Sequence, residues 1–217
     1  MSSVLDYFLD LLYPTKCILC RREMPPGKPS ICPACQAVMP LAAGMKKRDR
    51  YFTECVSALR YEGDVKHAIR RYKFEEAQIY HIAFGELVAE RIYEDLYGRF
   101  DILSWVPLSR DRRRDRGYDQ VELIARDVSK RLNVPLVPLL RKKKGVKAQS
   151  LTFSVEERRQ NIADAYRMKR NANVMGQRVL IIDDVVTSGS TLSECAKTLM
   201  NAGAKEVLCA TLATASH

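Results

Sequence analysis

Two adjacent acids and the loop of small hydroxyl residues after them carry the most specific chemistry in the sequence. Asp183 and Asp184 end an uninterrupted apolar run at residues 179–182, which is typical of a strand buried on both faces. The loop contains Thr187, Ser188, Gly189, Ser190 and Thr191, and a helical pattern begins within it. A helix N-terminus offers unpaired N–H groups, glycine permits close backbone approach and hydroxyls add donors, so the segment predicts a phosphate site.

The two acids indicate a ligand that is more than a phosphate. Because a carboxylate repels a phosphate, Asp183 and Asp184 are expected to contact sugar hydroxyls, a divalent metal ion, or both. The alternative is an ordinary strand-to-helix turn in which Ser190 or Thr191 caps the helix. A plain cap, however, requires neither adjacent acids nor hydroxyls on both sides of Gly189.

This segment resembles the phosphoribosyl pyrophosphate (PRPP) motif of type I phosphoribosyltransferases. In that family two acids hold the ribose hydroxyls and the following loop holds the 5′-phosphate. The resemblance implies that Asp183 and Asp184 bind the ribose together with Mg²⁺. It also implies that residues 187–191 bind the 5′-phosphate.

Two Cys-X-X-Cys pairs form a second candidate site. The cysteines are Cys17, Cys20, Cys32 and Cys35. Four thiolates at this spacing can surround Zn²⁺ at about 2.3 Å, and four-coordinate closure makes such a metal structural. An iron–sulfur cluster stays open as an alternative, whereas disulfides are disfavoured in a reducing cytosol. The other cysteines fall in apolar patterns and are expected in the core: Cys55, Cys195 and Cys209.

Basic residues follow two other predicted strands, in a chain with 36 Lys and Arg, 26 Asp and Glu, and a net charge of +10. Ser109 and Arg110 open a segment with five arginines that ends at Arg116. A longer basic loop covers residues 141–161, where we expect a lid that ends in a short capped helical turn. Its candidate anion-binding or DNA-binding residues are Lys142, Lys143, Lys144, Lys147 and Arg158.

The elements that must position these residues follow an alternating strand and helix pattern. We expect strands at 55–61, 101–106, 134–140, 163–169, 179–182 and 206–212. We expect helices at about 65–74, 76–97, 121–132 and 190–201, with Ile79 in the buried stripe of the second. An α/β fold with a mostly parallel sheet follows, and it would gather the loops after the strands at one crevice.

A polar run at residues 45–50 separates the cysteine-rich part from the rest, so we place domains at 1–48 and 49–217. The apolar helical pattern at residues 4–12 is too short to span a bilayer and lacks the basic residues of a signal peptide. We therefore expect a cytoplasmic protein that reaches the inner face of the membrane only through partners. The periodicity around Tyr61, Gly63 and Lys73 favours a solvated helix face over a substrate pocket.

The whole chain resembles the ComF family, which includes ComFC and GntX-like proteins. The motifs, in order, are the four cysteines after Tyr13-Pro14, the Tyr61-Glu62-Gly63 segment, Pro107 with Arg116-Gly117-Tyr118 and Gln120, Gln149 with Arg158 and Asn161, and the PRPP motif. Tyr118-Asp119 stands where the family has Phe-Asn, which replaces an amide with a carboxylate and weakens any anion or base contact there.

This resemblance implies a Rossmann-like type I phosphoribosyltransferase core after a small zinc module, with Mg²⁺ and PRPP at the site and Ser109-Arg110 as the pyrophosphate loop. It also implies single-stranded DNA handling in natural transformation, beside a ComFA-like ATPase or helicase. Three functions stay open. The protein could be a transferase acting on a nucleobase or nucleotide, a non-catalytic PRPP sensor, or a DNA-handling module in which Tyr118 and Phe153 are the candidate stacking rings.

Overall fold

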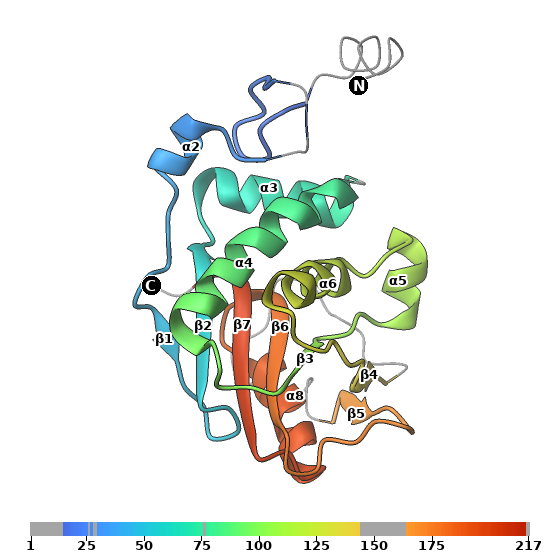
Figure 1. Cartoon of the computed structure of the whole chain (residues 1–217). Coiled ribbons are helices and arrows are strands. Elements are labelled where there is room, and N and C mark those ends of the chain that lie inside the picture. Colours follow the sequence, from blue (N-terminus) through green and yellow to red (C-terminus); the bar gives the residue numbers. More distant parts are fainter. Residues whose placement is uncertain (1–14, 26, 28–29, 76, 144–163, 216–217) are drawn as a thin grey trace.

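The computed structural model describes residues 15–25, 27, 30–75, 77–143 and 164–215. A five-stranded sheet forms its centre, in the order β1-β2-β7-β6-β3 (Figure 1). The strands are β1 (Lys46–Lys47), β2 (Glu54–Arg60), β3 (Ile102–Trp105), β6 (Arg178–Val186) and β7 (Glu206–Thr214). β1 pairs antiparallel with β2, and all other pairs are parallel, as the sequence predicted.

Both faces of the sheet are buried, and the interior strand β6, between β7 and β3, has an apolar run because both of its faces are covered. Leu180 and Ile182 belong to one hydrophobic core, while Val179 and Ile181 belong to a second. Successive side chains of a strand point to opposite faces, so the two cores lie on either side of the sheet. Helices α3 (Gly63–Phe74), α4 (His81–Leu96) and α6 (Gln120–Leu132) supply the first core, and α8 (Ser190–Asn201) supplies the second. The expected α/β class is confirmed.

Smaller elements surround the carboxyl ends of the parallel strands. Helix α5 (Arg110–Arg116) follows β3, and a two-stranded hairpin pairs β4 (Leu140–Lys142) with β5 (Tyr166–Met168). Figure 1 shows α5 and this hairpin at the same side of the sheet, with α6 leading away from α5. The remaining elements are α2 (Pro33–Ala37) and the 3₁₀ turn η1 (Gln78–Tyr80).

The strand predicted at residues 134–140 is wrong over most of its length. The segment meets β3 through a single bridge between Leu136 and Leu103, and only Leu140 enters a strand. Pro135 and Pro138 explain this, because proline has no N–H to donate to a ladder.

Three other boundaries differ from the prediction. The helix expected to begin near residue 76 begins at His81, after the 3₁₀ turn. The α-helical period therefore does not apply at Ile79, and its side chain is 47% exposed instead of buried. The arginine-rich segment predicted as a loop is helix α5. Strand β6 also runs two residues past the acids, to Val186, instead of ending at them.

The cysteine-rich part packs on α3. Cys17, Ile18 and Cys32 lie in the same core as residues of α3 and α4, and Arg71 of α3 donates to the carbonyl oxygens of Ile18 and Leu19 at 2.7 and 2.9 Å. The domain boundary at residues 48 and 49 stays a prediction. The helix predicted at residues 4–12 lies outside the described residues. Within the described part of the chain, no helix has the length and apolar character needed to cross a membrane.

Candidate functional site

The predicted phosphate loop joins the end of β6 to the first turn of α8. Gly189 has a left-handed backbone with φ 81°, and the Ser188 and Ser190 hydroxyls lie 2.9 Å apart. The N-cap of α8 is Gly189, which has no side chain, and the Ser190 N–H makes a long hydrogen bond of 3.4 Å to the Ser188 hydroxyl. Among the described residues no side chain caps the N–H groups of Thr191 and Leu192, so they remain available to an anion. Lys47 of β1 donates to the Thr187 carbonyl oxygen and thereby ties the loop to the sheet. Thr191 lies in the first turn of α8, so the structure brings all five predicted loop residues to one place.

The two acids have different surroundings. Asp184 is 8% exposed, and its carboxylate accepts from the Lys73 ammonium at 2.8 Å and from the Gln120 amide at 3.0 Å. Burial acts to raise the pKa of Asp184, but the charge and hydrogen bonds of Lys73 and Gln120 outweigh it, so the pKa lies below the usual value. The prediction of a solvated face around Lys73 is therefore wrong for this residue.

Asp183 keeps its carboxylate available. Among the described residues it forms no ion pair, and it accepts only the backbone N–H of Asp184 at 2.8 Å. Burial, and then the negative charge of Asp184, raises the pKa of Asp183 to about 8. A cation or a hydrogen-bond donor from a ligand would relieve this cost, which is the property expected of a group that holds a metal ion or a sugar hydroxyl.

The predicted pyrophosphate loop lies after β3. Ser109 is the N-cap of α5 and accepts the Arg112 N–H at 3.4 Å, and Arg110 begins that helix on an exposed position. The acid that departs from the family pattern, Asp119, is buried and accepts the backbone N–H groups of Leu108, Val121 and Glu122 at 3.0 to 3.2 Å. Its carboxylate therefore fixes the loop and the start of α6, and the residue also lines the cavity described next.

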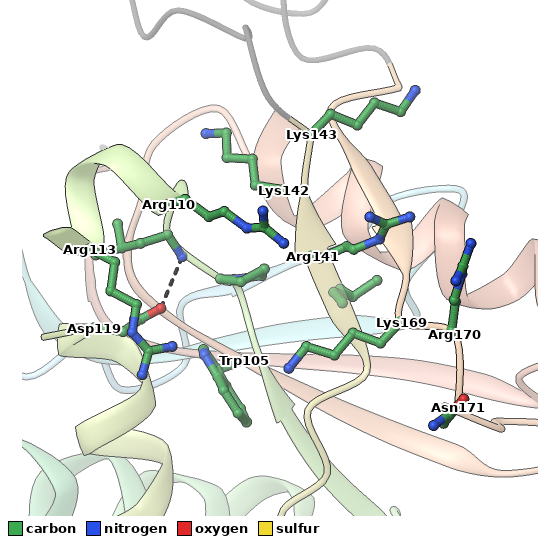
Figure 2. A pocket seen from close by; sticks show the side chains of 13 residues that line it. Trp105, Arg110, Arg113, Asp119, Arg141, Lys142, Lys143, Lys169, Arg170 and Asn171 are labelled. Carbon is green, nitrogen blue, oxygen red and sulfur yellow. Dashed lines mark hydrogen bonds between the residues drawn. The ribbon is translucent and has the colours of Figure 1, made fainter.

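A strongly basic cavity of about 780 Å³ lies between this loop and the β4–β5 hairpin. Its basic residues are Arg110, Arg113, Arg141, Lys142, Lys143, Lys169 and Arg170. Figure 2 shows Arg110 and Arg113 on one side, the hairpin residues on the other, and Trp105 at the base of the same region. Such a cavity suits a ligand with several phosphates. We call it the basic pocket.

The candidate basic residues do not share one site. Lys142 and Lys143 line the basic pocket, and burial, with Arg112 nearby, lowers the pKa of Lys142. Arg116 lies instead in a second cavity with Lys73. Lys144, Lys147 and Arg158, like Phe153 and the predicted capped turn, lie outside the described residues. Tyr118 is 8% exposed and donates its hydroxyl to the Tyr72 carbonyl oxygen, so its ring is largely covered, and its candidate stacking role stays a prediction.

Sequence reasoning missed two sets of site residues. Lys73 was missed because helical periodicity does not distinguish a lysine in a buried ion pair from a lysine exposed to solvent. Lys169 and Arg170 line the basic pocket, although the sequence places them at the end of a predicted strand and in a turn. Their only signal is the charge of two consecutive basic residues.

The four predicted metal-binding cysteines converge. All four Sγ atoms lie within 4.8 Å of one another, and the Cys20 and Cys32 sulfurs are 3.8 Å apart. A tetrahedral metal site with bonds of about 2.3 Å places its sulfurs roughly 3.8 Å apart, so the cluster fits a structural metal ion. Burial acts to raise the pKa of Cys17, but backbone N–H groups around its sulfur, from Cys32 above all, bring it to about 7 and favour the thiolate that a metal requires. Cys55, Cys195 and Cys209 are buried in the core, as predicted.

The fold and the loop after β6 define the class of protein. Residues 122–217 match the family described as the phosphoribosyl transferase domain, and this range contains both acids and the loop at 187–191. The chain therefore has an α/β core whose C-terminal part is similar to the phosphoribosyl transferase domain, preceded by a four-cysteine cluster.

Several relatives match over most of the chain. Competence protein F of Haemophilus influenzae is 26% identical, and the match covers 88% of this chain and 93% of that protein. Competence protein ComFC of Bacillus subtilis is 24% identical, with 86% and 78% covered. DNA utilization protein YhgH of Escherichia coli K12 is 27% identical, with 90% of each chain covered. These relatives confirm the resemblance to the ComF family.

Proposed function

We propose that this protein binds PRPP with Mg²⁺ at the carboxyl end of β6. Asp183 and Asp184 would orient the ribose, and residues 187–191 would hold the 5′-phosphate with the first N–H groups of α8. The observation that carries the proposal is the Asp183 carboxylate, which forms no ion pair within the described residues, beside a hydroxyl-rich helix start whose N-cap is a glycine. A phosphate alone would not require that carboxylate.

The pyrophosphate of PRPP would lie toward the basic pocket. Ser109 and Arg110 lie at its α5 side and Lys142 and Lys143 at its hairpin side, so the negative charge would be surrounded by cations. Mg²⁺ held at Asp183 and Asp184 would neutralise part of this charge. We assign the four-cysteine cluster to Zn²⁺, because four thiolates in a closed tetrahedron are typical of structural zinc.

We further propose a role in the handling of single-stranded DNA during DNA uptake. Three relatives are named for competence or for DNA utilization, and the basic pocket supplies cations for a phosphate backbone. This role places the protein in the cytoplasm, where a ComFA-like ATPase or helicase would be its partner and would account for any association with the inner membrane face.

A Gly189→Ala variant tests the PRPP site. Gly189 has φ 81° and open space at its Cβ position, so alanine strains the loop without a collision. Gly98→Ala is the matched control, because Gly98 has φ 75° and similar open space after α4. We expect calorimetry to show a loss of Mg-PRPP affinity of about tenfold or more for Gly189→Ala only. Equal affinities in both variants would argue against the proposed loop.

A pyrophosphate-release assay separates binding from transfer. The second candidate function is a genuine transferase with a nucleobase or nucleotide acceptor, and the third is a non-catalytic PRPP sensor. The protein is incubated with Mg-PRPP and a panel of nucleobases, nucleotides and oligonucleotides. Release that depends on one acceptor identifies a transferase, whereas binding without release for the whole panel identifies a sensor.

A further inference from the structure

A second cavity lies on the opposite side of α5 from the basic pocket. It has a volume of about 550 Å³, within the range of small-molecule sites, and its lining consists of Lys73, Phe74, Arg112, Asp115, Arg116 and Tyr118. The helical period of α5 explains the division. Arg110 and Arg113 line the basic pocket, whereas residues 112, 115 and 116 line this one. We call it the α3–α5 pocket.

Arg116 supplies an unsatisfied donor to this pocket. Its Nη1 atom is buried and has no hydrogen-bond partner among the residues that the structure describes. A buried polar group without a partner costs free energy, and the cost is larger for a charged group. An acceptor atom from a ligand would remove this cost. Because the guanidinium group is a planar fork, a ligand with two adjacent acceptor atoms fits it best.

Phe74 supplies a flat apolar surface beside this donor. Its side chain is 69% exposed at the C-terminal end of α3, and the Arg116 guanidinium lies over the ring, 4.7 Å from its centre, so the cation covers part of the ring. An aromatic ring placed beside the guanidinium can pack on the exposed remainder of Phe74 and accept hydrogen bonds from Arg116 at its edge. A flexible or aliphatic anion would satisfy only the second contact.

The charges around the pocket favour an electron-rich ligand. Lys73 is occupied by Asp184, and Arg112 and Arg116 have one acid among the lining residues, Asp115. Neither of these arginines forms an ion pair within the described part of the chain. Lys73 also joins the pocket to the proposed ribose site, since its ammonium lies 2.8 Å from the Asp184 carboxylate. A ligand in the pocket would lie next to the group that we expect to hold the ribose.

We propose that the α3–α5 pocket binds an oxo-substituted nucleobase, stacked on Phe74 and held at two adjacent acceptor atoms by Arg116. The binding of a base does not depend on the proposed function. Its role in the protein does, because the base would lie beside bound PRPP. The oxo group matters because arginine pairs with an adjacent carbonyl oxygen and ring nitrogen. An amino group in the place of the carbonyl oxygen is itself a donor, so it cannot accept a hydrogen bond from the Arg116 N–H.

Titrations followed by saturation-transfer NMR test this proposal, with hypoxanthine as the probe and adenine as its amino counterpart. Arg116→Lys keeps the charge and removes the fork, and Phe74→Leu keeps apolar surface and removes the ring. Arg114→Lys is the control, because the Arg114 side chain is 81% exposed on the same helix and lines neither pocket. Melting temperatures establish that all three variants fold. Inosine 5′-monophosphate, titrated in parallel, separates a free base from the base of a nucleotide.

We expect hypoxanthine to bind at least about tenfold more tightly than adenine. Arg116→Lys and Phe74→Leu should each weaken hypoxanthine binding about tenfold or more, whereas Arg114→Lys should not change it. Equal binding of the two bases, or equal affinities in all variants, overturns the proposal. Protein that binds Mg-PRPP but no oxo base, free or as the nucleotide, overturns this inference and leaves the proposed function standing. Binding of hypoxanthine without Mg-PRPP binding supports the pocket and contradicts the PRPP site.

Discussion

The two acids of the site perform different tasks, although the sequence places them side by side. Asp184 is held by Lys73 and Gln120, so its position is fixed before any ligand arrives. Asp183 is held only by a backbone N–H and remains the better ligand for an incoming metal ion or hydroxyl. A fixed acid next to an available acid is a suitable arrangement for recognising two neighbouring hydroxyls of a ribose.

Replacing Lys73 with methionine should show how much of this arrangement depends on one ion pair. The variant leaves the mostly buried Asp184 carboxylate without a cation, so the free energy of unfolding should fall by on the order of 1 to 3 kcal/mol. Lys66→Met is the control, because Lys66 is exposed on the same helix. Urea denaturation at pH 7 measures both variants. An equal loss of stability in the two would show that the ion pair contributes nothing.

Asp183 should make the stability of the ligand-free protein depend on pH. Its pKa is about 8 in the folded protein and 3.8 without the fold, so the folded state binds the proton more tightly than the unfolded state. The contribution to stability is therefore full below about pH 4 and is lost as the pH rises toward 8. The stability advantage of Asp183→Asn over the unmodified protein should grow between pH 5 and 8 and then level off. A constant difference across that range, measured by denaturant titration, would contradict the assigned pKa.

Helix α3 connects the cysteine cluster to the acids. Arg71 holds the carbonyl oxygens between Cys17 and Cys20, and Lys73, two residues along, holds Asp184. In the same helix, the Tyr72 hydroxyl donates to the Gln120 carbonyl oxygen at 2.6 Å. The cysteine cluster and the proposed ribose site therefore share one support, helix α3.

Removal of the metal should consequently weaken ligand binding at a distance. Chelation, or Cys17→Ser, should release the first cysteine turn and lower the amide-exchange protection of α3, while α8 keeps its protection. Mg-PRPP affinity should fall several-fold as Lys73 loses its fixed position. Hydrogen exchange and calorimetry on the same preparation measure the two effects. Unchanged protection in α3 after loss of the metal would remove the basis for the coupling.

The sequence was sufficient to predict an element where its local pattern of residues agrees with the tertiary structure. The apolar run of β6, the periodicity of α6 and the paired Cys-X-X-Cys turns each predicted the observed element or cluster. It failed at residues 134–140, where apolar character predicted a strand and two prolines prevented the ladder. It also failed at Lys73, because the partner that makes this lysine important comes from a strand more than a hundred residues later.

On the scale of the whole molecule, the cations gather at the side where the parallel strands end. The basic pocket, drawn in Figure 2, lies on one side of α5 and the α3–α5 pocket lies on the other. Helix α8 begins after the acids of β6. This arrangement allows one face to hold a phosphorylated sugar and to attract a nucleic-acid backbone.

A Lys169→Ala/Arg170→Ala variant should separate DNA binding from PRPP binding. Both residues line the basic pocket but are not among the proposed pyrophosphate contacts Ser109, Arg110, Lys142 and Lys143, so affinity for single-stranded oligothymidylate should fall much more than Mg-PRPP affinity. The dependence of log affinity on log salt should become shallower by about 1.4, at roughly 0.7 for each lost phosphate contact. Lys66→Ala/Lys130→Ala removes equal charge from other exposed positions as the control. Fluorescence anisotropy at several salt concentrations measures the slopes, and matching slopes in the two variants would exclude this pocket as the DNA contact.

The central claim is that the end of β6 recognises PRPP through its two acids and not through charge alone. Calorimetric titration of Mg-PRPP into the unmodified protein and into Asp183→Ala/Asp184→Ala tests it most directly. The account predicts saturable binding by the unmodified protein and an affinity at least about a hundredfold lower in the double variant, which still folds by circular dichroism. Equal affinities would contradict it, because they would show that the two acids take no part in binding PRPP.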